Sequence, residues 1–235
     1  MATSKEIIKL IKETGNATQA KLLQGYFKTG PGQYGEGDIF VGIKVPALRA
    51  LAKPHRDMDL EIVSELLTSE IHEVRMFALF VLIAKFRKAD EELQTQIFDV
   101  YTAHTDYINN WDLVDLSAGY IAGEFLRNRP KDILYEFARS NHLWKKRISI
   151  ISTSAWIKTL DFTHTLAISE ILLHDPHDLI QKAYGWMLRE VGKKDMKTEL
   201  DFLKIHYKTM PRTALRYAIE KFPEDLRQSF LKGKI

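Results

Sequence analysis

Long apolar runs with a helical period constrain the fold of this chain more than any other feature. In the segment 73–86, Val74 is followed by apolar residues three, four, seven and eight positions later, at Phe77, Ala78, Val81 and Leu82, which is the spacing of one helix face. The same period predicts long helices over 112–126, 143–157, 178–191 and 212–222. Shorter amphipathic helices are predicted over 91–101, 131–138, 162–173 and 197–207. The sequence therefore predicts an all-α protein.

The main interruption of this pattern lies between Thr29 and Gly42. This stretch contains Gly30, Pro31, Gly32, Gly35 and Gly37, which predict a loop, ending in a short extended piece over 39–41. A loop of this length is either a functional segment or a simple joint. We expect one domain over residues 1–235, with an N-terminal helix pair at about 1–28, a loop at 29–45 and repeats at about 46–235.

Basic residues recur at the start of the predicted long helices. Arg75 and Arg147 are 72 residues apart, twice 36, with Trp111 midway, and the next gaps, to Lys182 and then to Arg212, are 35 and 30 residues. This period predicts two-helix repeats, shorter and less regular than ideal HEAT units, stacked into a curved α-solenoid. The opening residues of these helices would then share the concave side. A general helical bundle with coincidental spacing is the alternative.

Composition and charge narrow the function classes. The chain has 235 residues and no Cys, which excludes disulfides and thiolate metal sites. No secretory segment opens it and no run approaches a membrane span, so we expect a cytoplasmic protein without a membrane partner. The net charge is only +3, but thirteen Lys and Arg face seven acids in 181–235, against thirteen and fifteen in the first 110 residues. This asymmetry predicts a basic, phosphate-facing surface in the C-terminal half, with a solvated helical surface as the alternative.

An aromatic side chain and a carboxylate stand four residues apart at Trp111 and Asp115, so a helix would place both on one face. Two later segments resemble this one, around Trp144 and Arg147 and around Trp186 and Arg189. An acid, two Trp and Arg side chains on parallel helices suit a positively charged substrate that is attached to a phosphate backbone.

Each of these residues also has a structural interpretation. Trp111 and Trp186 are alternatively core residues, and Asp115 is alternatively a buried acid paired with an Arg of the next repeat. Trp144 and Trp156 are assigned to packing. The run from His174 to Asp178 contains metal-ligating residue types, but it spans a helix start. We therefore expect Asp175 to be an N-cap, and no metal site or cofactor.

Five motifs in a fixed order resemble the AlkD-like family of DNA alkylation repair proteins. The segment Phe40–Pro46 resembles the family's FxGVRxP segment, and four further segments follow it over most of the chain. They are Asn109–Asp115, Leu143–Arg147, Lys182–Glu190 and Met210–Ala218. Each motif alone is weak, whereas all five with this spacing are specific.

The resemblance implies a HEAT-like-repeat 3-methyladenine and 7-methylguanine DNA glycosylase that needs no metal. It would hydrolyse the N-glycosidic bond of positively charged N3- or N7-alkylpurines in double-stranded DNA, as a monomer. The family's catalytic carboxylate would fall on Asp115 and its sugar-facing aromatics on Trp111 and Trp186. The resemblance implies phosphate contacts for Arg147 and Arg189, and an N-terminal aromatic at Tyr26, where the match is poor. Lys182, at the start of its helix, is a further predicted DNA contact.

Two other functions remain open. The first is a helical-repeat protein that binds damaged or branched DNA without excising a base. The second is a protein-interaction solenoid, for which DNA affinity would be absent or nearly insensitive to salt. Base-release assays separate the first from a glycosylase, and the salt dependence of binding separates the second.

Overall fold

The computed structural model describes residues 2–235, and these residues are helical apart from their connections. They form two compact units, residues 1–117 and residues 118–235. One isolated parallel bridge, between Ile39 and Ile71, is the only β-type pairing in the described part of the chain. The prediction of an all-α protein is confirmed, while the single domain and the curved solenoid with a basic concave face stay predictions.

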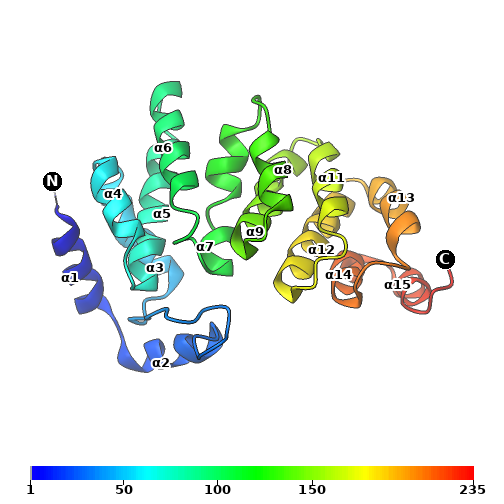
Figure 1. Ribbon diagram of the computed structural model, residues 1–235, viewed down its shortest axis with the longest axis horizontal. Coiled ribbons are helices and arrows are strands. Elements are labelled where there is room, and N and C mark those ends of the chain that lie inside the picture. Colours follow the sequence, from blue (N-terminus) through cyan, green and yellow to red (C-terminus); the bar gives the residue numbers. More distant parts are fainter. Residues whose placement is uncertain (1) are drawn as a thin grey trace. The chain divides into compact units, whose positions relative to one another are not determined.

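The first unit contains seven α-helices, which Figure 1 shows in blue to green. The first begins with a capping box, because Thr3 and Glu6 bond each other's backbone N–H groups. Helix α5 is almost entirely buried and packs against α3 and α4, so it forms the centre of this unit. The bounds are α1 Ser4–Thr14, α2 Ala17–Tyr26, α3 Val45–Ala52, α4 Leu60–Leu67, α5 His72–Phe86, α6 Glu91–Ala103 and α7 Trp111–Asp115.

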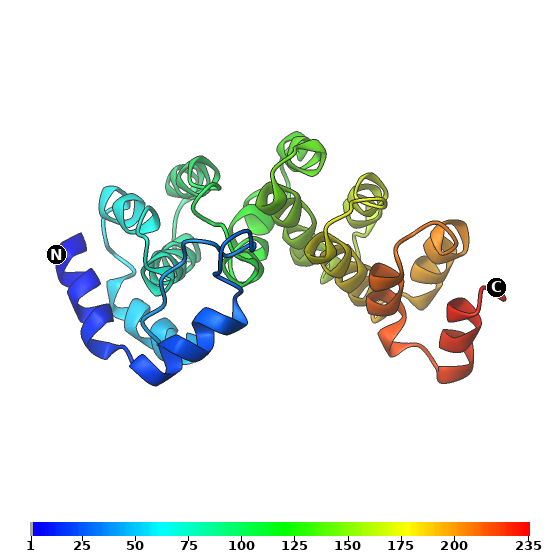
Figure 2. The ribbon, with the colours of Figure 1, turned by 60° about the horizontal axis from the view of Figure 1, so that its bottom comes forward.

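The second unit is built from consecutive helix pairs. Figure 2 shows α8, α11 and α13 in one row and α9, α12 and α14 in a second row beside it. Helix α12 packs against α9, α13 and α14 and forms the centre. The bounds are α8 Asp132–Arg139, α9 Leu143–Ser152, α10 Ser154–Ile157, α11 Thr163–Ile171, α12 Asp178–Gly192, α13 Met196–His206, α14 Arg212–Ala218 and α15 Glu224–Leu231.

The predicted helix over 112–126 is wrong as one continuous α-helix. The α-helical part ends at Asp115, and a π-helical turn over Gly119–Gly123 follows it. The Ser117 hydroxyl donates to the Leu113 carbonyl four residues earlier, and such a bond favours a local departure from regular helix. The two glycines also admit close neighbours, because a Cβ at Gly119 would meet the Ser154 hydroxyl and one at Gly123 the Ser152 carbonyl. The first unit ends within this break.

The 29–42 segment is a loop, as predicted, and it is anchored at its end by one acid. The Glu73 carboxylate, at the start of α5, accepts from the backbone N–H groups of Val41, Gly42 and Ile43 at 3.0, 2.7 and 3.2 Å. Gly42 has a φ of +89°, which only glycine adopts without strain. Its Cα also lies against the Asn16 backbone, so a side chain has no room there.

Packing residues behave as the sequence predicts. Trp144 and Trp156 are 6% and 1% exposed, and the Trp156 indole N–H donates to the Gly123 carbonyl at 2.8 Å. Among residues 2–235, no helix combines the length and the apolar character that crossing a bilayer requires.

Candidate functional site

Helix α7 presents Trp111 and Asp115 on its accessible side. Both residues are half-buried, whereas the three residues between them, Asp112, Leu113 and Val114, are buried. This burial pattern is the one that an i, i+4 pair predicts. The first turn is fixed by Asn110, whose side-chain oxygen accepts from the Trp111 backbone N–H at 2.8 Å.

Aromatic rings surround Trp111 within the first unit. Phe27 stacks on Trp111 with ring centroids 5.1 Å apart, and Tyr26 meets Trp111 edge-on at 6.0 Å. Tyr26 is 65% exposed, so one accessible aromatic face combines Tyr26 and Trp111. The structure thus brings together two predicted site residues that are 85 positions apart in sequence.

The 29–42 loop reaches the same place. The Trp111 indole N–H donates to the Tyr34 hydroxyl at 3.2 Å, and the Phe40 ring stacks on Phe27 at 5.0 Å. Tyr34 lies in the middle of the loop and Phe40 lies near its end. The loop is therefore part of the surroundings of Trp111 and not only a joint between helices.

A buried chain of charges lies beneath these rings. His72 Nδ1 lies 3.0 Å from Asp38 Oδ2 and His72 Nε2 lies 2.9 Å from Asp112 Oδ2, while Arg75 pairs with the other Asp38 oxygen. All four side chains are at least nine-tenths buried. Burial disfavours charge on His72, but the Asp112 and Asp38 carboxylates outweigh it and raise the pKa of His72 to about 9. The pKa of Asp38 is lowered: burial would raise it, but the hydrogen bond from His72 and the charge of Arg75 outweigh burial.

These charges also hold the chain just before α7. The Asn110 side-chain amide donates to Asp38 at 3.1 Å, and Arg75 donates to the Asn109 side-chain oxygen at 2.9 Å. Asp112 accepts from the Leu113 backbone N–H at 2.8 Å through the oxygen that His72 does not use. The residues on both sides of Trp111 are therefore tied to α5 and to the 29–42 loop.

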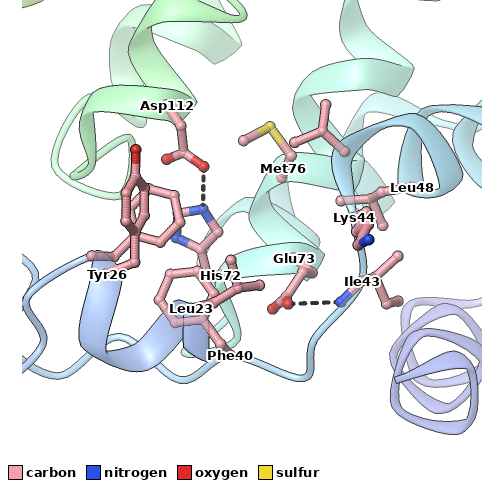
Figure 3. Close-up of a pocket in the computed structure, with 12 residues that line it drawn as sticks. Leu23, Tyr26, Phe40, Ile43, Lys44, Leu48, His72, Glu73, Met76 and Asp112 are labelled. Carbon is pink, nitrogen blue, oxygen red and sulfur yellow. Dashed lines mark hydrogen bonds and ion pairs between the residues drawn. The ribbon is translucent and has the colours of Figure 1, made fainter. Parts of the chain in front are cut away.

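A cavity of about 190 Å³ adjoins this cluster inside the first unit. Figure 3 shows Tyr26, His72 and Asp112 on one side of it and Lys44 and Leu48 on the other. Its walls are mostly apolar, and the dashed lines in Figure 3 mark the internal bonds that His72 and Glu73 make.

The predicted site residues of the second unit share one face of α12. Lys182, Trp186 and Arg189 are spaced four and three residues apart and are all half-buried. Each has an acidic partner. Lys182 Nζ lies 2.7 Å from Asp178, the Trp186 indole N–H donates to Glu190 at 3.0 Å, and Arg189 pairs with the exposed Glu220.

Arg147 has a different environment from the other predicted phosphate contacts. It is 5% exposed, and its guanidinium donates to the Leu179 backbone carbonyl within the second unit. Arg75 is likewise buried, at 3%. Arg75 and Arg147 are thus both buried, whereas Lys182 is half-buried, and a face shared by these basic residues stays a prediction. Contact between Arg147 and phosphate stays a prediction that requires the guanidinium to leave Leu179.

The cap of α12 also differs from the prediction. The N-cap is His177, whose Nδ1 accepts from the Leu179 backbone N–H, and not Asp175. Asp175 instead pairs with Lys146 at 2.7 Å and accepts from the His177 N–H. The two oxygens of the Asp175 carboxylate are thus bonded to Lys146 Nζ and to the His177 N–H, and His177 caps the helix in its place.

Sequence reasoning missed the groups that support Trp111. Asp38, His72 and Asp112 are polar residues in a loop, at a helix start and within an apolar turn, and no period links them. No sequence pattern links Tyr34 or Phe27 to Trp111 either. The only available hint was composition, because a loop with five glycines and one isolated aspartate followed by three apolar residues suggests an anchored segment.

Comparison with known proteins identifies the family to which the chain belongs. A family model described as "DNA alkylation repair enzyme" matches residues 7–222. No protein with a curated description matches the chain by sequence. A solved structure, "Predicted DNA alkylation repair enzyme from Enterococcus faecalis", matches with a TM-score of 0.71 and 17% identity, over 89% of this chain and 97% of that one. At this identity the structural likeness shows the shared fold. Because the family model spans nearly the whole sequence, this chain belongs to the family of DNA alkylation repair enzymes.

Proposed function

We propose that the protein is a DNA glycosylase that hydrolyses the N-glycosidic bond of N3- and N7-alkylated purines in double-stranded DNA. A role in DNA alkylation repair follows from the family, and the reaction and the substrate are the proposal. The observation that carries it is the accessible pair Trp111 and Asp115 on a helix turn whose other residues are buried. Tyr26 extends this face with a second exposed ring.

The chemistry needs few catalytic groups. An N3- or N7-alkylated purine already carries a positive charge, so when the C1′–N bond breaks, the bonding electron pair neutralises the leaving base without added acid. The deoxyribose becomes oxocarbenium-like, and water then adds to C1′ and loses a proton. Asp115 is proposed to stabilise the sugar cation and to orient the water and accept its proton.

The electrostatic interaction of a single carboxylate with the sugar cation is large enough to accelerate the reaction substantially. Two unit charges about 4 Å apart interact by about 4 kcal/mol at an effective dielectric constant of about 20. If this interaction is expressed only in the transition state, it accelerates the reaction about a thousandfold. The faces of Trp111 and Trp186 would add about 0.5–2 kcal/mol each through cation–π contact with the sugar or base.

The α12 face would hold the DNA backbone. Lys182 and Arg189 now pair with the carboxylates of Asp178 and Glu220, which are 55% and 47% exposed at the side chain. Exposed ion pairs contribute only about 0–1 kcal/mol, so a phosphate oxygen can replace the carboxylate at little cost. Arginine then has the geometry to bind a phosphate with two hydrogen bonds.

Release of the base from DNA that contains 7-methylguanine and 3-methyladenine tests this proposal. Asp115→Asn keeps the size of the side chain and removes its charge, so we expect base release to fall about a thousandfold while DNA affinity changes less than about threefold. Asp99→Asn, an exposed acid in α6 of the same unit, is the matched control and should retain the wild-type rate.

The outcomes separate the candidate functions. Equal release by wild type and Asp115→Asn would remove Asp115 from the mechanism. Tight, salt-dependent binding of methylated or branched DNA without any release by the wild type would identify a binding protein instead of a glycosylase. Absence of DNA affinity would contradict both and leave a protein-interaction role.

A further inference from the structure

The reaction proposed above depends on Trp111 and Asp115, yet α7 is only five residues long. A helix this short has no stability of its own, because helix nucleation is unfavourable and few hydrogen bonds compensate for it. Its position must therefore come from tertiary contacts. Several of these contacts are polar and buried, and His72 lies at their centre, with its two ring nitrogens bonded to Asp38 and Asp112.

We propose that His72 is a positioning residue: by bridging Asp38 and Asp112 it locks the 29–42 loop and the turn that carries Trp111 and Asp115 into a single arrangement. This inference rests on the proposed glycosylase function for its kinetic consequences, and its structural part stands independently. The lock consists of the side chains of Asp38, His72, Arg75 and Asp112, and we call these four the ionic ladder.

Hydrogen-bond chemistry requires His72 to be a cation in this arrangement. Both ring nitrogens face carboxylate oxygens, at 3.0 and 2.9 Å, and ionised carboxylates only accept. Both nitrogens must then donate, which only the imidazolium does. The order Asp112, His72, Asp38, Arg75 alternates in sign and sums to zero net charge, which is the arrangement in which buried charges are tolerated.

The neighbouring groups leave His72 as the titrating member of the ionic ladder. The Glu73 carboxylate is occupied by three backbone N–H groups, and Lys44 lies on the opposite side of the cavity in Figure 3. On its ring face His72 stacks on Phe40 at 4.3 Å, and Phe27 lies at 5.4 Å. The pKa of His72, at about 9, means that the ionic ladder is complete at neutral pH and loses its cation as the pH rises through about 9.

The ionic ladder fixes the position of Trp111 through two sets of contacts. The polar route runs through Asp112 within α7 and through Asn110, which joins Asp38 to the Trp111 N–H. The aromatic route runs from the His72 ring through Phe40 and Phe27 to the Trp111 ring. Loss of the His72 charge therefore loosens both the backbone and the ring of Trp111. A misplacement of about 1 Å in a reacting group costs about a hundredfold in rate.

Two substitutions separate positioning from simple stability. His72→Gln removes the ring and should lower kcat for 7-methylguanine release about tenfold to a hundredfold, with DNA affinity unchanged within about twofold. Asp112→Asn removes one charge but allows a neutral ladder, in which the Asn amide donates to a neutral His72 that still donates to Asp38. This variant should keep kcat within about fivefold. His55→Gln, a half-buried histidine of the same unit outside the ionic ladder, is the control.

The pH profile is the readout that a purely structural role would not change. Wild type should lose kcat above neutral pH with a midpoint near 9, because His72 loses its proton there. Asp112→Asn should lack this alkaline limb, since its ladder is already neutral. Wild-type kcat in His72→Gln, or a limb near pH 9 that persists in Asp112→Asn, would overturn the proposal. If His72→Gln does not fold, Asp112→Asn decides alone.

A spectroscopic measurement keeps this test independent of catalysis. With 5-fluorotryptophan in all four positions, the Trp111 resonance, assigned by its loss in Trp111→Phe, should titrate near pH 9 in wild type and not in Asp112→Asn. Trp144, Trp156 and Trp186 belong to the other unit and serve as internal controls. If the wild type releases no base but Trp111 titrates as expected, the glycosylase proposal fails and the ionic ladder stands. A Trp111 resonance whose chemical shift does not change with pH would contradict the proposal that His72 positions Trp111.

Discussion

The two clusters of candidate site residues are held in opposite ways. In the first unit, Trp111 and Asp115 lie on a short turn that is fixed from below by charges at least nine-tenths buried. In the second unit, Lys182 and Arg189 stand on a long helix and pair with exposed carboxylates. The first arrangement resists change, whereas the second exchanges partners at little cost.

This difference matches two different tasks. A catalytic carboxylate must be held close to its productive position before the substrate arrives, which buried partners achieve. A phosphate contact must release its internal partner when DNA binds, which exposed pairs permit. The comparison therefore assigns the catalytic carboxylate to the first unit and the phosphate contacts to the second, and each of the following substitutions tests one side of that assignment.

The largest effect is expected from breaking the ionic ladder. Asp38→Ala leaves His72 and Arg75 buried without their shared counter-charge, which should destabilise the first unit by about 3–5 kcal/mol. Segment-resolved hydrogen exchange should show the loss in α5 and α7, with the second unit unaffected. Asp59→Ala, an exposed acid without a capping bond at the start of α4, should change little. Equal protection in both variants would show that the ionic ladder does not hold this unit.

In the second unit, replacing a buried acid is expected to raise stability instead of lowering it. Glu199 is 1% exposed and one of its oxygens has no partner; burial raises the pKa of Glu199 to about 8, and Arg189 opposes this. Because the folded-state pKa lies above the unfolded value of 4.5, stability is full below pH 4.5 and falls as the pH rises toward 8. Glu199→Gln should remove this fall and stabilise the second unit at pH 8 by roughly 4 kcal/mol.

Denaturation of the Glu199→Gln variant at pH 5 and pH 8 checks this prediction, with hydrogen exchange in α12 and α13 locating the change. Glu224→Gln, an exposed acid in the same unit that pairs with Arg227, is the matched control. A stability difference between the two pH values as large in Glu199→Gln as in wild type would contradict it.

The smallest effect is expected at the exposed pair of Arg189. Glu220→Gln removes the competitor of a phosphate, so DNA affinity should rise about twofold to fivefold, in keeping with an exposed ion pair. Arg189→Ala should instead reduce the slope of log affinity against log salt by about one. Fluorescence anisotropy with a labelled duplex at several salt concentrations measures both. Unchanged affinity and slope in both variants would remove Arg189 from the DNA-binding surface.

The sequence predicted what depends on local pattern. The period of apolar residues located α5 and α12 within one residue, and the spacing of Trp111 and Asp115 predicted their shared accessible side. It failed where distant residues decide. The helix over 112–126 is interrupted where glycines pack closely on α9 and α10, and Arg147 is buried and donates to the Leu179 carbonyl, 32 positions away.

The supporting residues of the site were out of reach for the same reason. Asp38 and His72 are 34 positions apart, and His72 and Asp112 are 40 apart, so only the folded chain shows that they meet. Tyr26 was assigned from a poor match, and the structure places its ring against Trp111. A single sequence without periodicity between such positions contains no physical signal of their contact.

The central claim is that the first unit supplies the catalytic carboxylate and the second unit supplies the phosphate contacts. Single-turnover base release at saturating enzyme, measured together with the dissociation constant for DNA, tests it most directly. For DNA carrying 7-methylguanine, Asp115→Asn should lower the rate about a thousandfold with the dissociation constant nearly unchanged. Arg189→Ala should raise the dissociation constant and leave the saturated rate within about threefold. The opposite result, in which Asp115→Asn loses only affinity or Arg189→Ala loses only rate, would contradict the assignment of chemistry to the first unit and of DNA grip to the second.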